Sequence, residues 1–138
     1  MTLLDKYKEL LKQAEVLAIE NLRCTEQNGL LNICGTAVNA EVKNKLWDVY
    51  SQINPNFIAN EVTLNVAVSP VVKGNKMRIV TEETKVNVRK GPSVELPIIT
   101  NIDKDNIITL LGRANDYWWL IRTNNFEGYC YVQNMEPI

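Results

Sequence analysis

The spacing of apolar residues changes near the middle of the chain, and this change limits the possible folds more than any other feature. Before residue 69, apolar residues recur at helical steps in two stretches and alternate in strand fashion in others. After residue 76, only short β-rich runs remain between turn-forming residues. The stretch 69–76 holds a proline, a glycine and two lysines and fits neither period. We therefore predict a domain at 1–70, a linker at 71–76 and a second domain at 77–138, because 138 residues suffice for two small cores.

The first half is predicted to be an α+β domain. Helical spacing covers residues 3–20, with Thr2 and Asp5 placed as a capping box, and 40–53, with Asn39 as the N-cap. Between the helices, the strand-like runs 22–25 and 30–36 flank an Asn-Gly pair that is typical of a hairpin turn. Residues 61–69 then alternate as a strand. This order of helix, hairpin, helix and strand allows two helices to cover one face of a three-stranded sheet.

The second half is predicted to be all β. Short β-rich runs occupy residues 85–89, 98–102, 107–111, 118–122 and 129–132. Short strands at this spacing, joined by turn-rich stretches, favour a small barrel.

Composition excludes several classes of function. The chain is 46% apolar and 22% charged with a formal net charge of −1, which indicates a folded protein and argues against nucleic-acid binding. No apolar run approaches the ~20 residues that a membrane span requires. The N-terminal residues lack the pattern of an export signal, so the sequence as written predicts a cytoplasmic protein.

The residues of common catalytic and metal sites are missing. There is no histidine, which removes the usual general base and any Ser/His or Cys/His pair. The three cysteines have no C-x-x-C spacing, and the sequence offers no Gly-rich phosphate loop. We therefore expect no enzymatic activity, no metal and no cofactor.

The second half resembles a bacterial SH3-type domain from about residue 78 to 138. The resemblance is carried by VNVRKGPS at 86–93 and by three later residue pairs: Ile108 with Leu110, Trp118 with Ile121, and Gly128 with Tyr129. Thr100 and Asp105 replace two usual turn glycines, and Tyr117 departs from the residue usual before the tryptophan. The resemblance implies an SH3-like barrel that recognises cell-wall peptides or protein segments.

Residues 1–69 resemble a BON domain, a bacterial α/β module. The supporting features are the hairpin residues Gly29, Leu31, Ile33 and Gly35, the helix with Val42, Leu46 and Val49, and the closing strand VTLNVAV. The resemblance implies a module that gives a second contact or a homodimer. One known arrangement joins a BON domain to a LysM module in a cytoplasmic potassium-binding protein, but the second module of this chain is different.

Aromatic residues concentrate in the last third of the chain and give the candidate binding site. By the family register we expect Trp118 to point inward and Trp119 and Tyr131 to form an exposed platform. Asn87 and Arg89 alternate outward on the first strand and could donate hydrogen bonds to a peptide. The predicted ligand-binding residues are therefore Asn87, Arg89, Tyr117, Trp119 and Tyr131. The alternatives are a solvated strand face for Asn87 and Arg89, and interdomain packing for Trp119.

The leading hypothesis is a binding or adaptor protein whose partner is a peptide, a peptidoglycan fragment or another protein. A wall ligand would place the chain in the cell envelope and would require a leader that this sequence lacks. The second hypothesis is a cytoplasmic potassium or small-ligand sensor that uses backbone carbonyls of residues 69–75 at the junction. A third is an accessory module for a cell-wall hydrolase encoded elsewhere.

Overall fold

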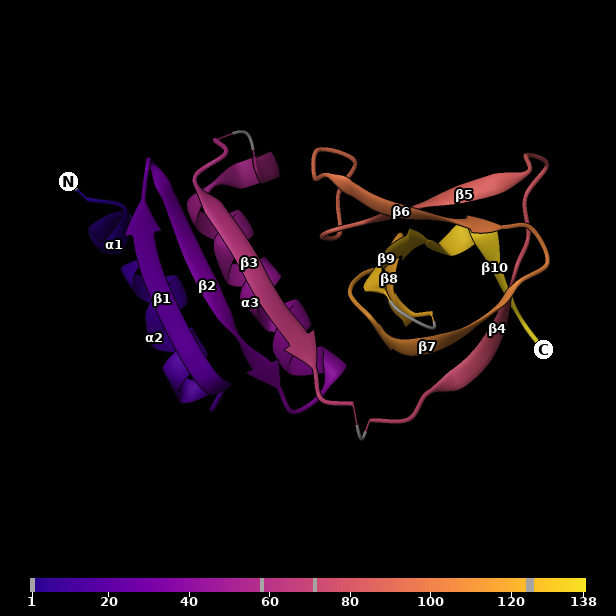
Figure 1. Ribbon diagram of the computed structural model, residues 1–138, viewed down its shortest axis with the longest axis horizontal. Coiled ribbons are helices and arrows are strands. Elements are labelled where there is room, and N and C mark those ends of the chain that lie inside the picture. Colours follow the sequence, from indigo (N-terminus) through magenta and orange to yellow (C-terminus); the bar gives the residue numbers. More distant parts are fainter. Residues whose placement is uncertain (1, 58, 71, 124–125) are drawn as a thin grey trace. The chain divides into compact units, whose positions relative to one another are not determined.

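The computed structural model describes residues 2–57, 59–70, 72–123 and 126–138. The chain divides into two compact units, residues 1–70 (unit 1) and residues 71–138 (unit 2) (Figure 1). Among the described residues, no helix has the length and apolar character needed to cross a membrane.

Unit 1 is a three-stranded sheet with helices on one face (Figure 1). Its elements are α1 (Leu3–Lys6), α2 (Lys8–Val16), β1 (Glu20–Gln27), β2 (Leu30–Ala37), α3 (Ala40–Ile53), a short 3₁₀ turn (Pro55–Phe57) and β3 (Val62–Val68). β2 pairs antiparallel with β1 and parallel with β3. Because parallel neighbours need a crossover, α3 makes the connection. The predicted α+β region with a hairpin, a helix and a strand is confirmed.

The register of β2 and β3 decides which face of this sheet is buried. Leu31 pairs with Val62 and Ile33 with Leu64, and these side chains are buried. Asn65, the residue of β3 that follows Leu64, is exposed. The core of unit 1 therefore lies between the sheet and its helices.

The local signals read from the sequence have the expected geometry. Thr2 Oγ1 accepts a hydrogen bond from the Asp5 amide at 3.2 Å, and Asn39 Oδ1 accepts one from the Val42 amide at 2.9 Å. In the hairpin, Asn28 and Gly29 have φ of 54° and 77°. Positive φ at both central residues is what a type I′ turn requires.

The first helix differs from the prediction. Instead of one helix over 3–20, two segments meet at Tyr7, where φ is −104° and ψ is 23°, and the second ends at Val16. Tyr7 is buried, and its hydroxyl donates to Glu61 Oε2 at 2.6 Å. Helical spacing alone missed the break because a contact 54 residues away accompanies it.

Unit 2 is an antiparallel sheet that curls around one core (Figure 1). Its strand order is β10-β4-β7-β8-β9-β5-β6. The bounds are β4 (Asn75–Ile79), β5 (Lys85–Arg89), β6 (Ile98–Asp103), β7 (Ile107–Arg113), β8 (Trp118–Arg122), β9 (Glu127–Tyr131) and β10 (Met135–Pro137), with a 3₁₀ turn at Val132–Asn134. Every strand contributes a buried residue to this core, namely Met77, Ile79, Val86, Val88, Ile102, Ile108, Ile121, Cys130 and Met135.

Two strands of unit 2 were not expected from the sequence. β4 and β10 pair with each other and are short, with charged residues among the apolar ones. The predicted linker 71–76 overlaps β4, which begins at Asn75. The β-rich pattern predicts five strands. The other two, β4 and β10, form through pairing with distant segments.

The residue types at positions 105 and 128 suit the backbone geometry found there. Asp105 stands where a turn glycine is usual and has φ of 71°, a conformation that Asp tolerates better than most residues. A Cβ added to Gly128 would lie 2.6 Å from Val88 Cγ1 and 2.8 Å from the Arg89 carbonyl oxygen. Gly128 thus allows β9 to approach β5 closely.

Candidate functional site

The pairing of β8 with β9 decides which aromatic side chains share a face. Trp118 lies opposite Tyr131, and Trp119 lies opposite Cys130. Paired residues of an antiparallel ladder point to the same side, and consecutive residues point to opposite sides. Trp118 and Tyr131 therefore share one face, and Trp119 lies on the other.

This register corrects the expected facing of the two tryptophans. Trp119 was expected beside Tyr131, but it packs against the core of unit 2. Trp118 was expected to point inward, but it is half-buried beside Tyr131. Consecutive residues of a strand face opposite sides, so the pairing of β8 with β9 decides which tryptophan lies beside Tyr131.

Tyr117, Trp118 and Tyr131 form a contiguous aromatic face. The rings of Tyr117 and Tyr131 are stacked, with centroids 6.4 Å apart and planes 7° apart. The edge of one ring in the Trp118–Tyr131 pair meets the face of the other, at 5.5 Å and 69°. Tyr117 is 61% exposed, so the stack presents aromatic surface to solvent.

A pocket of about 330 Å³ opens beside this aromatic face. We call it the Tyr131 pocket. It combines aromatic and aliphatic side chains with amide groups and one guanidinium; its lining residues are Asn87, Arg89, Val94, Trp118, Tyr131 and Asn134. A few polar groups in an otherwise apolar concavity are typical of a small binding site.

Arg89 connects this pocket to the loop that follows β5. Its Nη1 donates to the carbonyl oxygens of Val94 and Leu96, each at 2.9 Å. Asn101 Nδ2 donates to Asn87 Oδ1 at 2.6 Å, which fixes the Asn87 amide so that its NH₂ group is available as a donor. Arg89 therefore has a structural role in the loop in addition to its place in the pocket wall.

The predicted site residues are only partly brought together. The structure places Asn87, Arg89 and Tyr131 in one pocket, with Tyr117 stacked at its rim. Trp119 lines a different pocket with Arg113, described below. Sequence reasoning missed Val94, Trp118 and Asn134. The place of Trp118 follows from its pairing with Tyr131, and the other two come from segments without a motif.

Side chains suited to a metal ion do not converge in the described residues. Among them, no three His, Cys, Asp or Glu side chains form a cluster suited to a metal ion. Burial raises the pKa of the Cys130 thiol to about 11, so this thiol is protonated near neutral pH.

The junction considered for an ion site is described in part. Residue 71 lies outside the described residues. The Val72 carbonyl accepts a hydrogen bond from Arg122 Nη1 at 3.1 Å. The Val72 carbonyl is one of those that the sensor hypothesis would use to bind a cation, and it already accepts this hydrogen bond. The Arg122 guanidinium also places a positive charge beside it, which disfavours a cation there.

Comparison with protein families identifies part of unit 2. Residues 84–136 match the bacterial SH3 domain. This range includes every residue of the Tyr131 pocket. Domains of this family are typically modules that bind cell-wall material or peptides. No curated protein gives a significant match to the chain. The comparisons give no evidence for a BON domain in residues 1–69, so the order of elements is all that supports that resemblance.

Proposed function

We propose, on the premise that residues 84–136 are a bacterial SH3 domain, that unit 2 is a non-enzymatic module that binds a peptide in the Tyr131 pocket. The peptide is a segment of the cell wall or of a partner protein. The observation that carries the proposal is the stacked Tyr117–Tyr131 pair, with Trp118 against it, at the edge of a pocket with polar donors.

The aromatic face supplies the apolar part of recognition. Tyrosine and tryptophan give large, rigid contact area at a small cost in side-chain entropy. A volume of about 330 Å³ is at the lower end for ligand sites, so it suits one or two residues of an extended chain. The stacked Tyr117–Tyr131 pair would contact the peptide residues on either side of those in the pocket.

The polar groups supply orientation. A peptide exposes carbonyl oxygens and, at its end, a carboxylate, and both accept hydrogen bonds. The amides of Asn87 and Asn134 and the outer N–H groups of Arg89 are donors of the required kind. Because Arg89 is already held by Val94 and Leu96, its side chain loses little freedom when a ligand binds.

Unit 1 would give a second contact or a dimer in this proposal. Its helix, hairpin, helix and strand follow the order expected of a BON-like module. The proposal places the protein at the envelope if the ligand is peptidoglycan, and in the cytoplasm if it is an intracellular protein segment.

The test is co-sedimentation of the purified chain with peptidoglycan sacculi, followed by NMR titration with a wall stem peptide. We expect saturable shifts at Trp118 and Tyr131, and binding at least about tenfold weaker in Tyr131→Ala. Asn87→Ala should weaken binding less and leaves the aromatic face intact.

Ile107→Ala is the matched control, because Ile107 is an exposed apolar residue outside the Tyr131 pocket. Amide spectra must show that each variant is folded. Full retention of binding by folded Tyr131→Ala would contradict the assigned site. Absence of binding to sacculi and stem peptide would exclude the wall ligand and direct the search to intracellular peptides.

A further inference from the structure

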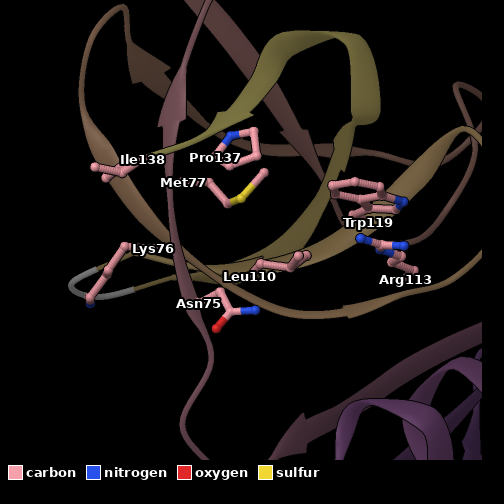
Figure 2. A pocket seen from close by; sticks show the side chains of 8 residues that line it. All are labelled: Asn75, Lys76, Met77, Leu110, Arg113, Trp119, Pro137 and Ile138. Carbon is pink, nitrogen blue, oxygen red and sulfur yellow. The ribbon is translucent and has the colours of Figure 1, made fainter.

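A second, larger pocket lies on the other side of β8, where Trp119 points. It has a volume of about 500 Å³ and draws its walls from β4, β7, β8 and β10. We call it the Trp119 pocket. Figure 2 shows the side chains that line it: Asn75, Lys76, Met77, Leu110, Arg113, Trp119, Pro137 and Ile138.

The lining of the Trp119 pocket combines apolar side chains with two positively charged ones. Leu110 and Trp119 pack against the buried core, which fixes the apolar wall. Lys76 and Arg113 are the charged lining residues, and no acidic side chain lines the pocket. The site therefore favours a ligand that is apolar and carries negative charge.

Neither cation is neutralised by a carboxylate among the described residues. Lys76 Nζ donates to the Thr109 hydroxyl at 2.8 Å, a neutral partner. The guanidinium carbon of Arg113 lies 4.5 Å from the centroid of the Trp119 ring (Figure 2). By contrast Arg78, on the same strand as Lys76, lies 3.7 Å from Glu136.

The contact of Arg113 with Trp119 prepares the guanidinium for an anion. An interaction with a ring uses the face of the guanidinium and leaves the N–H donors on its edge. Those donors form a planar fork that matches the two oxygens of a carboxylate. Holding the side chain on the ring also reduces the entropy that it loses when a ligand binds.

We propose that the Trp119 pocket binds an apolar carboxylate, whose acidic group pairs with Arg113 and whose apolar body rests on Leu110, Met77 and Trp119. The carboxylate belongs to a small organic acid or to the C-terminal residue of a peptide. This site is separate from the Tyr131 pocket, because Trp118 and Trp119 project from opposite faces of β8. It therefore stands or fails independently of the function proposed above.

The test is NMR titration of the full chain with N-acetyl-phenylalanine and, in parallel, with the corresponding amide. At millimolar concentrations of the acid, we expect saturable shifts at the Trp119 indole, the Met77 methyl and the Leu110 methyls. The amide should bind at least about tenfold more weakly than the acid. A short peptide ending in phenylalanine, with a free or an amidated C-terminus, distinguishes the two sources of the carboxylate. Tighter binding of the free-acid peptide than of the small acid would assign a peptide end, and the reverse would assign a small acid.

Variants locate the acidic group. Arg113→Gln should weaken binding about tenfold, and Arg113→Lys should weaken it by a smaller factor, because lysine keeps the charge and loses the fork. Arg78→Gln removes the same charge outside the pocket and should leave the affinity within about twofold. Equal binding of acid and amide, shifts confined to Trp118 and Tyr131, or no saturable shift at all would each overturn the proposal.

Discussion

The two units bury their sheets in different ways. In unit 1 helices cover one face, so β3 alternates between buried and wetter residues along its length. In unit 2 the sheet curls on itself, and the consecutive residues Leu120 and Ile121 of β8 are both fully buried. Tyr129 and Cys130 of β9 repeat this pattern.

The difference between the two sheets decides where strand alternation is informative. Alternating polarity identifies the core face when one side of a sheet meets water, as in unit 1. When neighbouring residues on both faces are buried, polarity no longer distinguishes the faces, and only the pairing does. Burial on both faces of β8 and β9 should leave little room for added atoms on these two strands.

The largest expected effect is that of Gly128→Ala. The new methyl group would meet the Arg89 carbonyl and Val88 at less than 3 Å, so we expect unit 2 to lose about 2–3 kcal/mol of unfolding free energy. Hydrogen exchange resolved by peptide would report the loss for each unit separately.

Gly29→Ala is the control in unit 1. Gly29 has φ of 77° and nothing within 4 Å of an added Cβ, so only conformational strain of about 1 kcal/mol is expected. An equal or smaller loss in Gly128→Ala would show that the close approach in unit 2 is not a constraint.

The next effect concerns unit 1. Tyr7→Phe removes the hydroxyl that donates to Glu61 and should lower the unfolding free energy of unit 1 by about 1–2 kcal/mol. Denaturant unfolding of the variant measures this change in unfolding free energy. Tyr117→Phe changes an exposed tyrosine of unit 2 and should have no measurable effect on stability. Similar losses in both variants would contradict the assigned role of the Tyr7 hydroxyl.

The same cluster should make the stability of unit 1 depend on pH. Hydrogen bonds from Lys6, at 2.7 Å, and from Tyr7 hold the pKa of Glu61 below its ordinary value. The stabilisation is therefore complete above the ordinary glutamate pKa of about 4.3 and is lost as the pH falls through the lower folded-state value. Unfolding of the wild type and of Glu61→Gln, compared across this range, should show a steeper acid loss in the wild type. Parallel curves would exclude Glu61 as the cause.

The smallest effect is expected in thiol modification, where the two units should differ in how soon their cysteines are labelled. Cys24 and Cys34 of unit 1 are half-buried, whereas Cys130 of unit 2 is fully buried, with its pKa raised to about 11 by burial. Alkylation at pH 8 should reach the two cysteines of unit 1 first, and Cys130 only when unit 2 opens. Mass spectrometry of digested protein at successive times checks the order. Early labelling of Cys130 under native conditions would contradict the burial described for β9.

Local signals in the sequence predicted most elements, and non-local contacts account for the errors. The Asn39 cap and the Asn28-Gly29 turn act within a few residues, so their patterns were sufficient. The break at Tyr7 is accompanied by a hydrogen bond to Glu61, a residue that no local pattern connects with it.

The candidate site, too, was predicted where local signals suffice and missed where non-local pairing decides. Asn87 and Arg89 were predicted from strand alternation and Tyr131 from the family register, and all three line one pocket. The face of Trp119 depends on the register with β9, and the Trp119 pocket depends on β4 and β10, which have weak strand signals. The sequence could not indicate that pocket because its walls come from strands that meet only in the folded sheet.

The pairing of β4 with β10 has a consequence for synthesis of the chain. These are the first and last strands of unit 2, yet they are neighbours in the sheet. The ribosome must therefore release almost the whole of unit 2 before its strand order can be completed, whereas the last strand of unit 1 ends at Val68. Unit 1 is thus positioned to fold before unit 2 as the chain emerges.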